Sequence, residues 1–292
     1  MGYRREHLAM LLFSVLVAGS FSLGSMVANE ISPAALNTVR FLIAGLLVGG
    51  VAMMTTGIKR SDFAAPWRYL LLGGLFAGYF VLMFEGLKTA TPVGAAAVFT
   101  LTPILSAGFG YLLLRQITTA RMALALSIGA VGALWVIFRA DIAAFLQFRI
   151  GSGEMIYFWG CVMHALYTPM VRKFNCGEAP VVFTFGVMVA GFFVLLVYGG
   201  RDVIEVNWAS LSAMVWVTIL YVSIAASSIT FVLLQFAVLR LPASKVMAYT
   251  YLVPSWVILW EVILGHGTPH RLVFWGVGLT VIALWMLLKD ET

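Results

Sequence analysis

The sequence predicts an all-α membrane protein with ten transmembrane helices, arranged as a five-plus-five inverted repeat. Three observations lead to this prediction: the composition, a series of long apolar runs, and an internal repeat. Of the 292 residues, 62% are hydrophobic and 10% are charged, and the mean hydropathy is +1.01. A soluble domain is roughly half apolar and about a quarter charged, so a soluble core cannot absorb this excess.

Ten apolar runs, each bounded by charged residues, glycine or proline, give the expected helices in order. The first half of the chain holds the runs 8–28, 33–55, 67–87, 92–114 and 118–138. The second half holds the runs 152–171, 179–198, 210–236, 242–264 and 270–288. Each is close to the roughly 20 residues that a helix needs to cross a bilayer. The runs are continuous and lack the period-two alternation of barrel strands, so we expect helices.

The first run, 8–28, resembles a secretory signal in its position at the N-terminus. It has no obvious A-x-A cleavage site, and many similar runs follow it. We therefore expect a retained first helix rather than a cleaved signal.

The distribution of Lys and Arg between the loops sets the expected orientation. If the N-terminus is cytoplasmic, twelve lie on that side: Arg4, Arg5, Lys59, Arg60, Arg68, Arg115, Arg121, Arg172, Lys173, Arg240, Lys245 and Lys289. Five lie on the other side: Lys88, Arg139, Arg149, Arg201 and Arg271. Arg40 lies inside a predicted helix. We therefore expect both the N and C termini to be cytoplasmic. The expected location of the protein is the cell inner (plasma) membrane.

The chain also repeats itself. From Phe99 the first half reads FTLTPILSAGFGYLLLRQITTARMALALSIGAVGALWVI, and from Thr250 the second half reads TYLVPSWVILWEVILGHGTPHRLVFWGVGLTVIALWMLL. We expect two five-helix units, residues 1–140 and 141–292. Because five is odd, the second unit must enter the membrane from the opposite side, which inverts the repeat. Inverted repeats commonly provide alternating access, with a site near the midplane between the halves.

Several partners and groups are not expected. The net charge of +6 does not indicate nucleic acid, because no basic run exceeds two residues. Cys161 lies inside an apolar segment and Cys176 beside a basic turn, with no C-x-x-C motif and no suitable His spacing, so we expect no disulfide framework and no metal site. The chain has no P-loop, so it is not expected to consume ATP, and we expect no cofactor.

Two long segments resemble a known family. They read LKTATPVGAAAVFTLTPILSAGFGYLLLRQITTARMALALSIGAVGALWVIF in the first half and LRLPASKVMAYTYLVPSWVILWEVILGHGTPHRLVFWGVGLTVIALWMLL in the second. Together with the repeat, they make the chain similar to the drug/metabolite transporter superfamily, specifically to its EamA-type ten-helix exporters. The resemblance covers nearly the whole chain and specifies the family better than the substrate.

The resemblance implies a basket of helices one to four and six to nine around a central cavity, braced by helices five and ten. The aromatic-amino-acid exporter branch is similar in size and in its aromatic, nearly uncharged interior. We therefore expect export of amino acids or related metabolites, including aromatic and other neutral ones, from the cytoplasm. Branches that bind anions are less favoured, because the mid-membrane positions hold no Lys or Arg pair. The expected partners are this small-molecule substrate and the lipid bilayer, and the oligomeric state stays open, with a monomer as the simplest expectation.

Other functions remain as alternatives. An exporter of another small metabolite or a drug would share this architecture. A membrane-embedded enzyme would need chemical groups within the membrane, yet the chain offers no H-E-x-x-H and its four aspartates all lie in predicted loops or tails, so we expect no enzyme and no catalytic residue. A structural subunit gives no reason for an inverted repeat. Proton antiport and facilitated diffusion are both open as energy coupling.

Pro103 and Pro254 fall near the centres of the fourth and ninth predicted helices. Each removes a backbone hydrogen bond and can bend its helix, so the pair are candidate hinges beside the cavity. Static kinks that only shape the packing are the competing explanation.

Seven residues are candidates for substrate binding, because hydroxyl groups, rings and an imidazole suit the zwitterion and side chain of an amino acid. They are Tyr79, Phe99, Thr100, Trp159, His164, Tyr249 and Thr250. His164 lies about halfway along its helix, where an ionisable group can bind substrate or carry a proton. A buried, hydrogen-bonded histidine and ordinary helix packing are the competing explanations.

Arg40, Glu85 and Glu261 are candidates for a gate or for coupling. All three are predicted in the outer half of the membrane, where Arg40 paired with either glutamate would form an extracellular gate. Snorkelling of each side chain to the headgroups is the simpler account.

Overall fold

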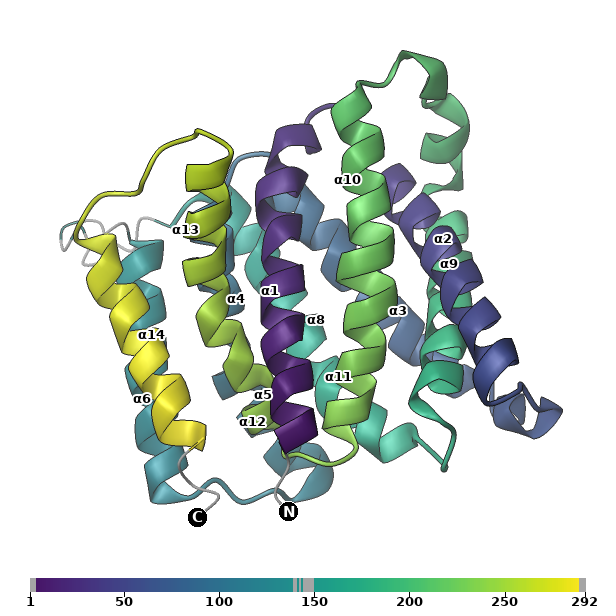
Figure 1. Cartoon of the computed structure of the whole chain (residues 1–292), viewed down its shortest axis with the longest axis horizontal. Helices are drawn as coiled ribbons and strands as arrows, with labels where there is room; N and C mark the ends of the chain where they lie inside the picture. Colours follow the sequence, from purple (N-terminus) through teal and green to yellow (C-terminus); the bar gives the residue numbers. More distant parts are fainter. Residues whose placement is uncertain (1–3, 139–140, 142, 144–149, 289–292) are drawn as a thin grey trace.

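The computed structural model describes residues 4–138, 141, 143 and 150–288. All regular elements within these residues are helical, and Figure 1 shows them packed side by side in one bundle. The ten predicted helices are confirmed. Three residues used in the charge count, Arg139, Arg149 and Lys289, lie outside the described residues, as does residue 140 at the expected boundary between the units.

The first half of the chain forms five helices, the fourth of which is broken. They are α1 (Arg4–Val27), α2 (Pro33–Thr55), α3 (Trp67–Gly86), α4 with α5 (Pro92–Phe99 and Thr102–Leu114) and α6 (Ala120–Ile137); a short turn, η1 (Arg60–Phe63), precedes α3. The side chains of Thr91 and Thr119 cap α4 and α6 by accepting backbone N–H groups, which satisfies donors that the first turn leaves open.

The second half forms the other five helices, and two of these are interrupted. They are α8 (Ser152–Phe174), α9 (Pro180–Glu205), α10–η3–α11 (Ala213–Ser223, Ile224–Ile229, Thr230–Val238), α12–η4–α13 (Ala243–Ala248, Tyr249–Leu252, Val253–Ile263) and α14 (Val273–Leu288); a short turn, η2 (Trp208–Ser210), follows α9. The segment η3 is a π-helix. No proline or glycine marks it in the sequence.

Most of these helices suit a bilayer. In the described residues, eight helices are long and apolar enough to cross a membrane. This count treats the consecutive segments of each broken helix as one helix. The helix α14 is apolar but has only 16 residues, and α8 has 23 residues but carries Glu154 and His164. Large apolar side chains such as Val197 and Trp275 are exposed on the outside, as a lipid-facing surface requires.

The two halves enter the bundle from opposite edges. The helix α1 starts at the lower edge of Figure 1, where Glu6 pairs with Arg240 beyond the end of α11 at 3.3 Å. The helix α8 starts at the upper edge, where a Cβ on Gly153 would fall 2.3 Å from the carbonyl oxygen of Gly86, the last residue of α3. An odd number of helices in each half produces this reversal.

Helices four and nine are each interrupted just before a proline. The α4–α5 break precedes Pro103, and the η4 segment precedes Pro254. The Thr102 hydroxyl donates to the Phe99 carbonyl at 2.7 Å, a carbonyl that the proline, having no N–H, cannot satisfy. The two breaks meet, because the hydroxyl oxygens of Thr102 and Thr250 lie 3.3 Å apart.

The pair α6 and α14 stands at one side of the bundle, on the left of Figure 1. A Cβ on Gly132 would fall 2.6 Å from the Gly276 carbonyl oxygen, and a Cβ on Gly276 would fall 2.6 Å from the Gly132 carbonyl oxygen. The two backbones are therefore in direct contact. The Thr280 hydroxyl of α14 donates to the Tyr251 carbonyl in η4 at 3.0 Å. The pair therefore braces the broken ninth helix.

Candidate functional site

A small space lies inside the bundle where residues of both halves meet; we call it the central chamber. The first half lines it with Phe13, Val17, Ser20, Phe76, Tyr79, Phe80 and Met83, and the second with His164, Ala226, Thr230 and Phe231. Its volume is about 10 Å³, about the least that holds one water molecule. In this structure the chamber is therefore too small to hold a solute.

Aromatic rings surround His164 on several sides. The centre of its ring lies 4.6 Å from that of Tyr79, 5.2 Å from Phe76 and 5.4 Å from Phe99. Phe76 in turn stacks on Tyr167 at 4.1 Å. Three of the predicted binding residues, Tyr79, Phe99 and His164, thus come together from α3, α4 and α8.

Tyr157 belongs to the same group, although we did not predict it from the sequence. Its hydroxyl lies 3.1 Å from that of Tyr79, and its side chain is fully buried. Tyr157 precedes His164 by seven residues, which puts both on one face of α8. The seven-residue spacing from His164 is the sequence feature that could have indicated Tyr157 as a site residue.

Polar atoms around the chamber are left without partners. The Ser20 hydroxyl and the Nδ1 of His164 are both buried, and neither has a hydrogen-bond partner within the described part of the chain. Buried polar groups are usually paired. Two open groups on the lining suit a bound polar ligand, since one could satisfy both.

Arg40 is fully buried in α2 and lies beside the chamber. Its Nε donates to the Ser227 hydroxyl at 2.6 Å, and a terminal nitrogen donates to the Ala226 carbonyl at 2.8 Å. Its guanidinium carbon lies 3.5 Å from the centre of the Phe80 ring. The other terminal nitrogen, Nη1, has no partner among the described residues.

The predicted pairing of Arg40 with a glutamate is wrong for this state. Glu85 pairs with Lys88 at 2.7 Å, and Glu261 pairs with His266 at 3.0 Å. Both glutamates lie near the upper ends of their helices. The base that pairs with Glu85 follows it by three residues, and the base that pairs with Glu261 follows it by five. Arg40 points inward, toward the π-segment, because the aromatic face of α3 holds its guanidinium there.

Three other predicted residues are buried but, like Phe99, do not line the chamber. The Thr100 hydroxyl donates to the Ala97 carbonyl of its own helix at 2.6 Å. Thr250 faces Thr102 across the two breaks. The Tyr249 hydroxyl lies 2.7 Å from Nδ1 of His7, near the start of α1.

The prediction for Trp159 is wrong, because its side chain is 59% exposed on the outside of the bundle. It precedes His164 by five residues, and five steps of about 100° place it roughly 140° away around the helix. Closeness in sequence to His164 therefore misled the prediction.

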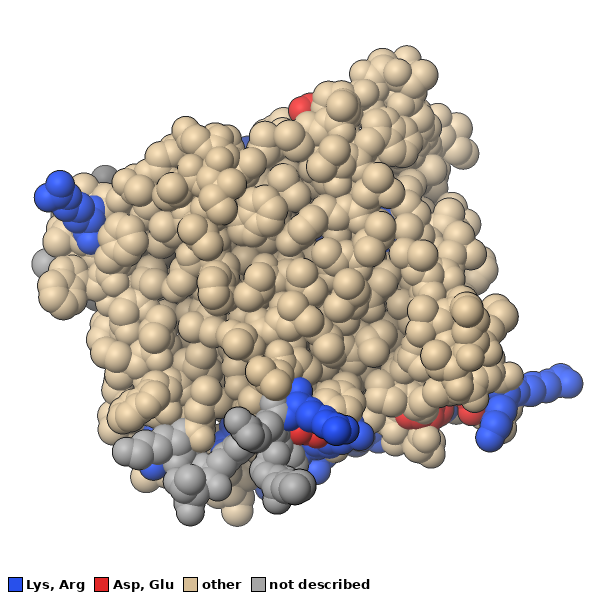
Figure 2. All heavy atoms as spheres, viewed as in Figure 1, with Lys and Arg blue, Asp and Glu red and all other residues tan. Residues whose placement is uncertain are grey.

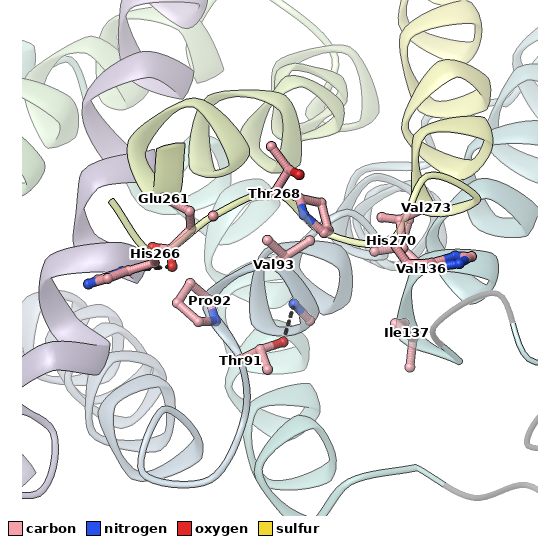
Figure 3. Close-up of a pocket in the computed structure, with 13 residues that line it drawn as sticks. Thr91, Pro92, Val93, Val136, Ile137, Glu261, His266, Thr268, His270 and Val273 are labelled. Atoms are coloured by element: carbon pink, nitrogen blue, oxygen red, sulfur yellow. Dashed lines mark hydrogen bonds and ion pairs between the residues drawn. The ribbon is translucent and has the colours of Figure 1, made fainter. Parts of the chain in front are cut away.

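A second, larger pocket of about 350 Å³ opens at the upper edge. It lies between the start of α4, the end of α6 and the segment that joins α13 to α14. Figure 3 shows His266 turned toward Glu261. His270 and Val136 also line the pocket. One oxygen of Glu261, Oε1, is buried and has no partner among the described residues. We call this pocket the upper vestibule.

A buried ion pair closes the lower edge between α3 and the α8–α9 connection. Arg68 donates to Glu178 at 2.7 Å, and both side chains are about 95% buried. Burial alone would raise the pKa of Glu178. Hydrogen bonds from Arg68 and from the backbone N–H of Cys176 outweigh it and lower that pKa below its ordinary value.

Comparisons with known proteins agree with this architecture. The model of the EamA-like transporter family matches twice, over residues 4–138 and 151–289. The chain is 28% identical over 284 residues to a Bacillus subtilis (strain 168) protein named "Uncharacterized transporter YyaM", a match covering 96% of this chain and 92% of that one. A solved structure described as "Crystal structure of protein" matches with a TM-score of 0.72 at 21% identity, covering 98% of this chain and 96% of that one, and shows the fold alone. This chain is therefore a multi-pass transporter of the cytoplasmic membrane rather than an enzyme, and it belongs to the EamA-like transporter family.

Proposed function

We propose that this transporter exports neutral amino acids, aromatic ones included, from the cytoplasm and that the substrate binds in the central chamber. One observation supports this most: rings and two unpartnered polar atoms from both halves line a single space. Such a lining suits a molecule with an apolar or aromatic body and a few polar groups.

Transport through this chamber needs a change of shape. Ligand pockets usually hold about 300 Å³ or more, whereas the chamber holds about 10 Å³. We propose alternating access, in which the units 1–140 and 141–292 move relative to each other. Pro103 and Pro254 are the proposed hinges, because the breaks beside them meet at Thr102 and Thr250 and each proline lacks the N–H of one helical hydrogen bond.

The hinge proposal is tested by restoring the missing N–H groups with Pro103→Ala and Pro254→Ala. We expect slower transport with an unchanged unfolding temperature, because a continuous helix bends less easily. Unchanged transport by the double variant would make the breaks static kinks.

We also propose that the lower edge faces the cytoplasm. Figure 2 shows most Lys and Arg side chains of the visible face gathered along that edge. Positive charge favours the cytoplasmic side of a membrane protein. The upper vestibule would then be the extracellular exit.

The function is tested by uptake into proteoliposomes. Purified protein would be given radiolabelled Phe, Met, Thr, Lys and Glu at two pH gradients, with empty liposomes as the control. We expect uptake of the neutral amino acids only, and a pH effect would indicate proton coupling. Failure of folded protein to take up any amino acid would overturn this proposal.

A further inference from the structure

Arg40 is a cation that the described part of the protein leaves without a counter-charge. Its contacts are all neutral: the Ser227 hydroxyl, the Ala226 carbonyl and the Phe80 ring. Five glutamates of the described residues form ion pairs with other bases. They are Glu6, Glu85, Glu178, Glu205 and Glu261.

Holding α2 against the π-helix η3 explains the presence of Arg40 only in part. A cation within a membrane protein is costly unless it is paired, and an apolar residue of similar size often packs there more stably. An arginine that only joined α2 to the π-segment would use all of its donors. Nη1 instead stays open although it is buried.

The surroundings of Arg40 connect it to the central chamber. Phe80 and Ala226 touch the guanidinium and also line the chamber. The π-helix η3 brings the Ala226 carbonyl and the Ser227 hydroxyl to the same cation, and single π-turns are frequent at functional sites. Ser223, the residue before η3, also has a buried hydroxyl that finds no partner in the described part of the chain.

The charges around the chamber favour one end of an amino acid over the other. None of the described residues that line the chamber is acidic, so they offer no ionic partner to an ammonium group. A carboxylate could neutralise Arg40 and accept from its open Nη1, with the Ser20 hydroxyl as a further donor. The rings would hold the apolar body.

We propose that Arg40 binds the carboxylate of the transported molecule, so that the chamber recognises a monocarboxylate with an aromatic or apolar body and does not require an amino group. This inference rests on the proposed role of the central chamber as the transport site. It narrows the substrate class, because amines without a carboxylate are excluded.

Three ligands of matched shape test this: L-phenylalanine, 3-phenylpropionate, which lacks the amino group, and 2-phenylethylamine, which lacks the carboxylate. Binding would be measured in detergent as the rise in unfolding temperature. We expect both carboxylates to stabilise the wild type and the amine to have no effect. Stabilisation by the amine, or by neither carboxylate, overturns the inference.

Two variants of Arg40 separate binding from folding. Arg40→Met should lose carboxylate binding by about tenfold or more, as expected for a lost charged hydrogen bond. Without ligand it should unfold at the same or a higher temperature, because an unpaired buried charge is removed. Arg40→Lys should keep part of the binding, and Arg201→Gln, which removes an exposed cation, should keep all of it.

The outcomes distinguish this inference from the proposed function. Binding of 3-phenylpropionate without uptake of any amino acid would leave the inference standing and remove the amino-acid proposal. Uptake of phenylalanine together with binding of 2-phenylethylamine would support the amino-acid proposal and overturn the inference about Arg40. An Arg40→Met protein that unfolds several degrees lower without ligand would show that Arg40 is structural, and would overturn the inference.

Discussion

His164 and Trp159 lie on the same helix, yet one faces the central chamber and the other faces outward. This makes them a matched pair for mutation. His164→Ala removes a lining ring and a polar group, so we expect the initial uptake rate in proteoliposomes to fall about tenfold, as for the loss of one well-placed hydrogen bond. Trp159→Ala should transport at the wild-type rate. Equal rates for the two variants would remove His164 from the site.

Glu178 makes a contribution to stability that depends on pH. Because its pKa in the folded protein lies below the ordinary value of 4.5, its pairing with Arg68 stabilises the fold above that pH. The contribution is lost as the pH falls through the lower, folded-state pKa. Glu178→Gln should therefore cost about 2 kcal/mol at neutral pH, and its difference from wild type should shrink on acidification.

The measurement for Glu178 is the unfolding temperature in detergent from about pH 7 to about pH 3, a range that spans the titration of a carboxyl. Glu205→Gln removes an exposed pair with Arg201 and should change little at any pH. A constant difference between Glu178→Gln and wild type over the whole range would contradict the argument.

At the level of elements, the close pair α6–α14 depends on two glycines. A Cβ on Gly276 would fall 2.6 Å from a backbone oxygen of α6, which cannot move aside as a side chain could. Gly276→Ala should therefore destabilise the protein by about 1–3 kcal/mol, measured by thermal unfolding. Gly278→Ala is the matched control, since a Cβ there meets nothing within 4 Å. Equal unfolding temperatures for the two variants would argue against tight packing of this pair.

The sequence predicted elements well where the signal is local. Apolar runs give the ten helices, because each must satisfy its own backbone in the membrane. Proline predicted two of the interruptions. The π-segment η3 has no such mark, because its stretch Ile224–Ile229 is as apolar as its neighbours and its shape depends on contacts with other helices, including Arg40 of α2.

At the level of the whole molecule, the position of a side chain depends on how each helix is rotated, and the sequence specifies this less strongly. The rings of Tyr79, Phe99 and His164, each a candidate binding residue, lie together in the structure, and their role in binding stays a prediction. Trp159 lies on the outside instead, and Arg40 was assigned a glutamate that has a nearer base. Identifying Tyr157 required comparing spacings along α8, whereas the chamber volume could come only from the packed structure.

The direction of transport depends on which edge of the molecule faces the cytoplasm, and a native cysteine reports this. Cys176 is exposed in the α8–α9 connection at the lower edge, whereas Cys161 is buried. In intact cells a membrane-impermeant maleimide should fail to label Cys176, and it should label the residue after the membrane is permeabilised.

Asn207→Cys, combined with Cys176→Ser, is the control for the opposite edge. Asn207 is exposed in the connection that follows α9, so this cysteine should be labelled in intact cells. The reverse pattern would place both termini outside and turn the upper vestibule into the cytoplasmic entrance. Proteoliposomes hold the protein in both orientations, so uptake alone cannot decide this. The labelling therefore determines whether an observed amino-acid flux corresponds to export from the side that the charge distribution predicts.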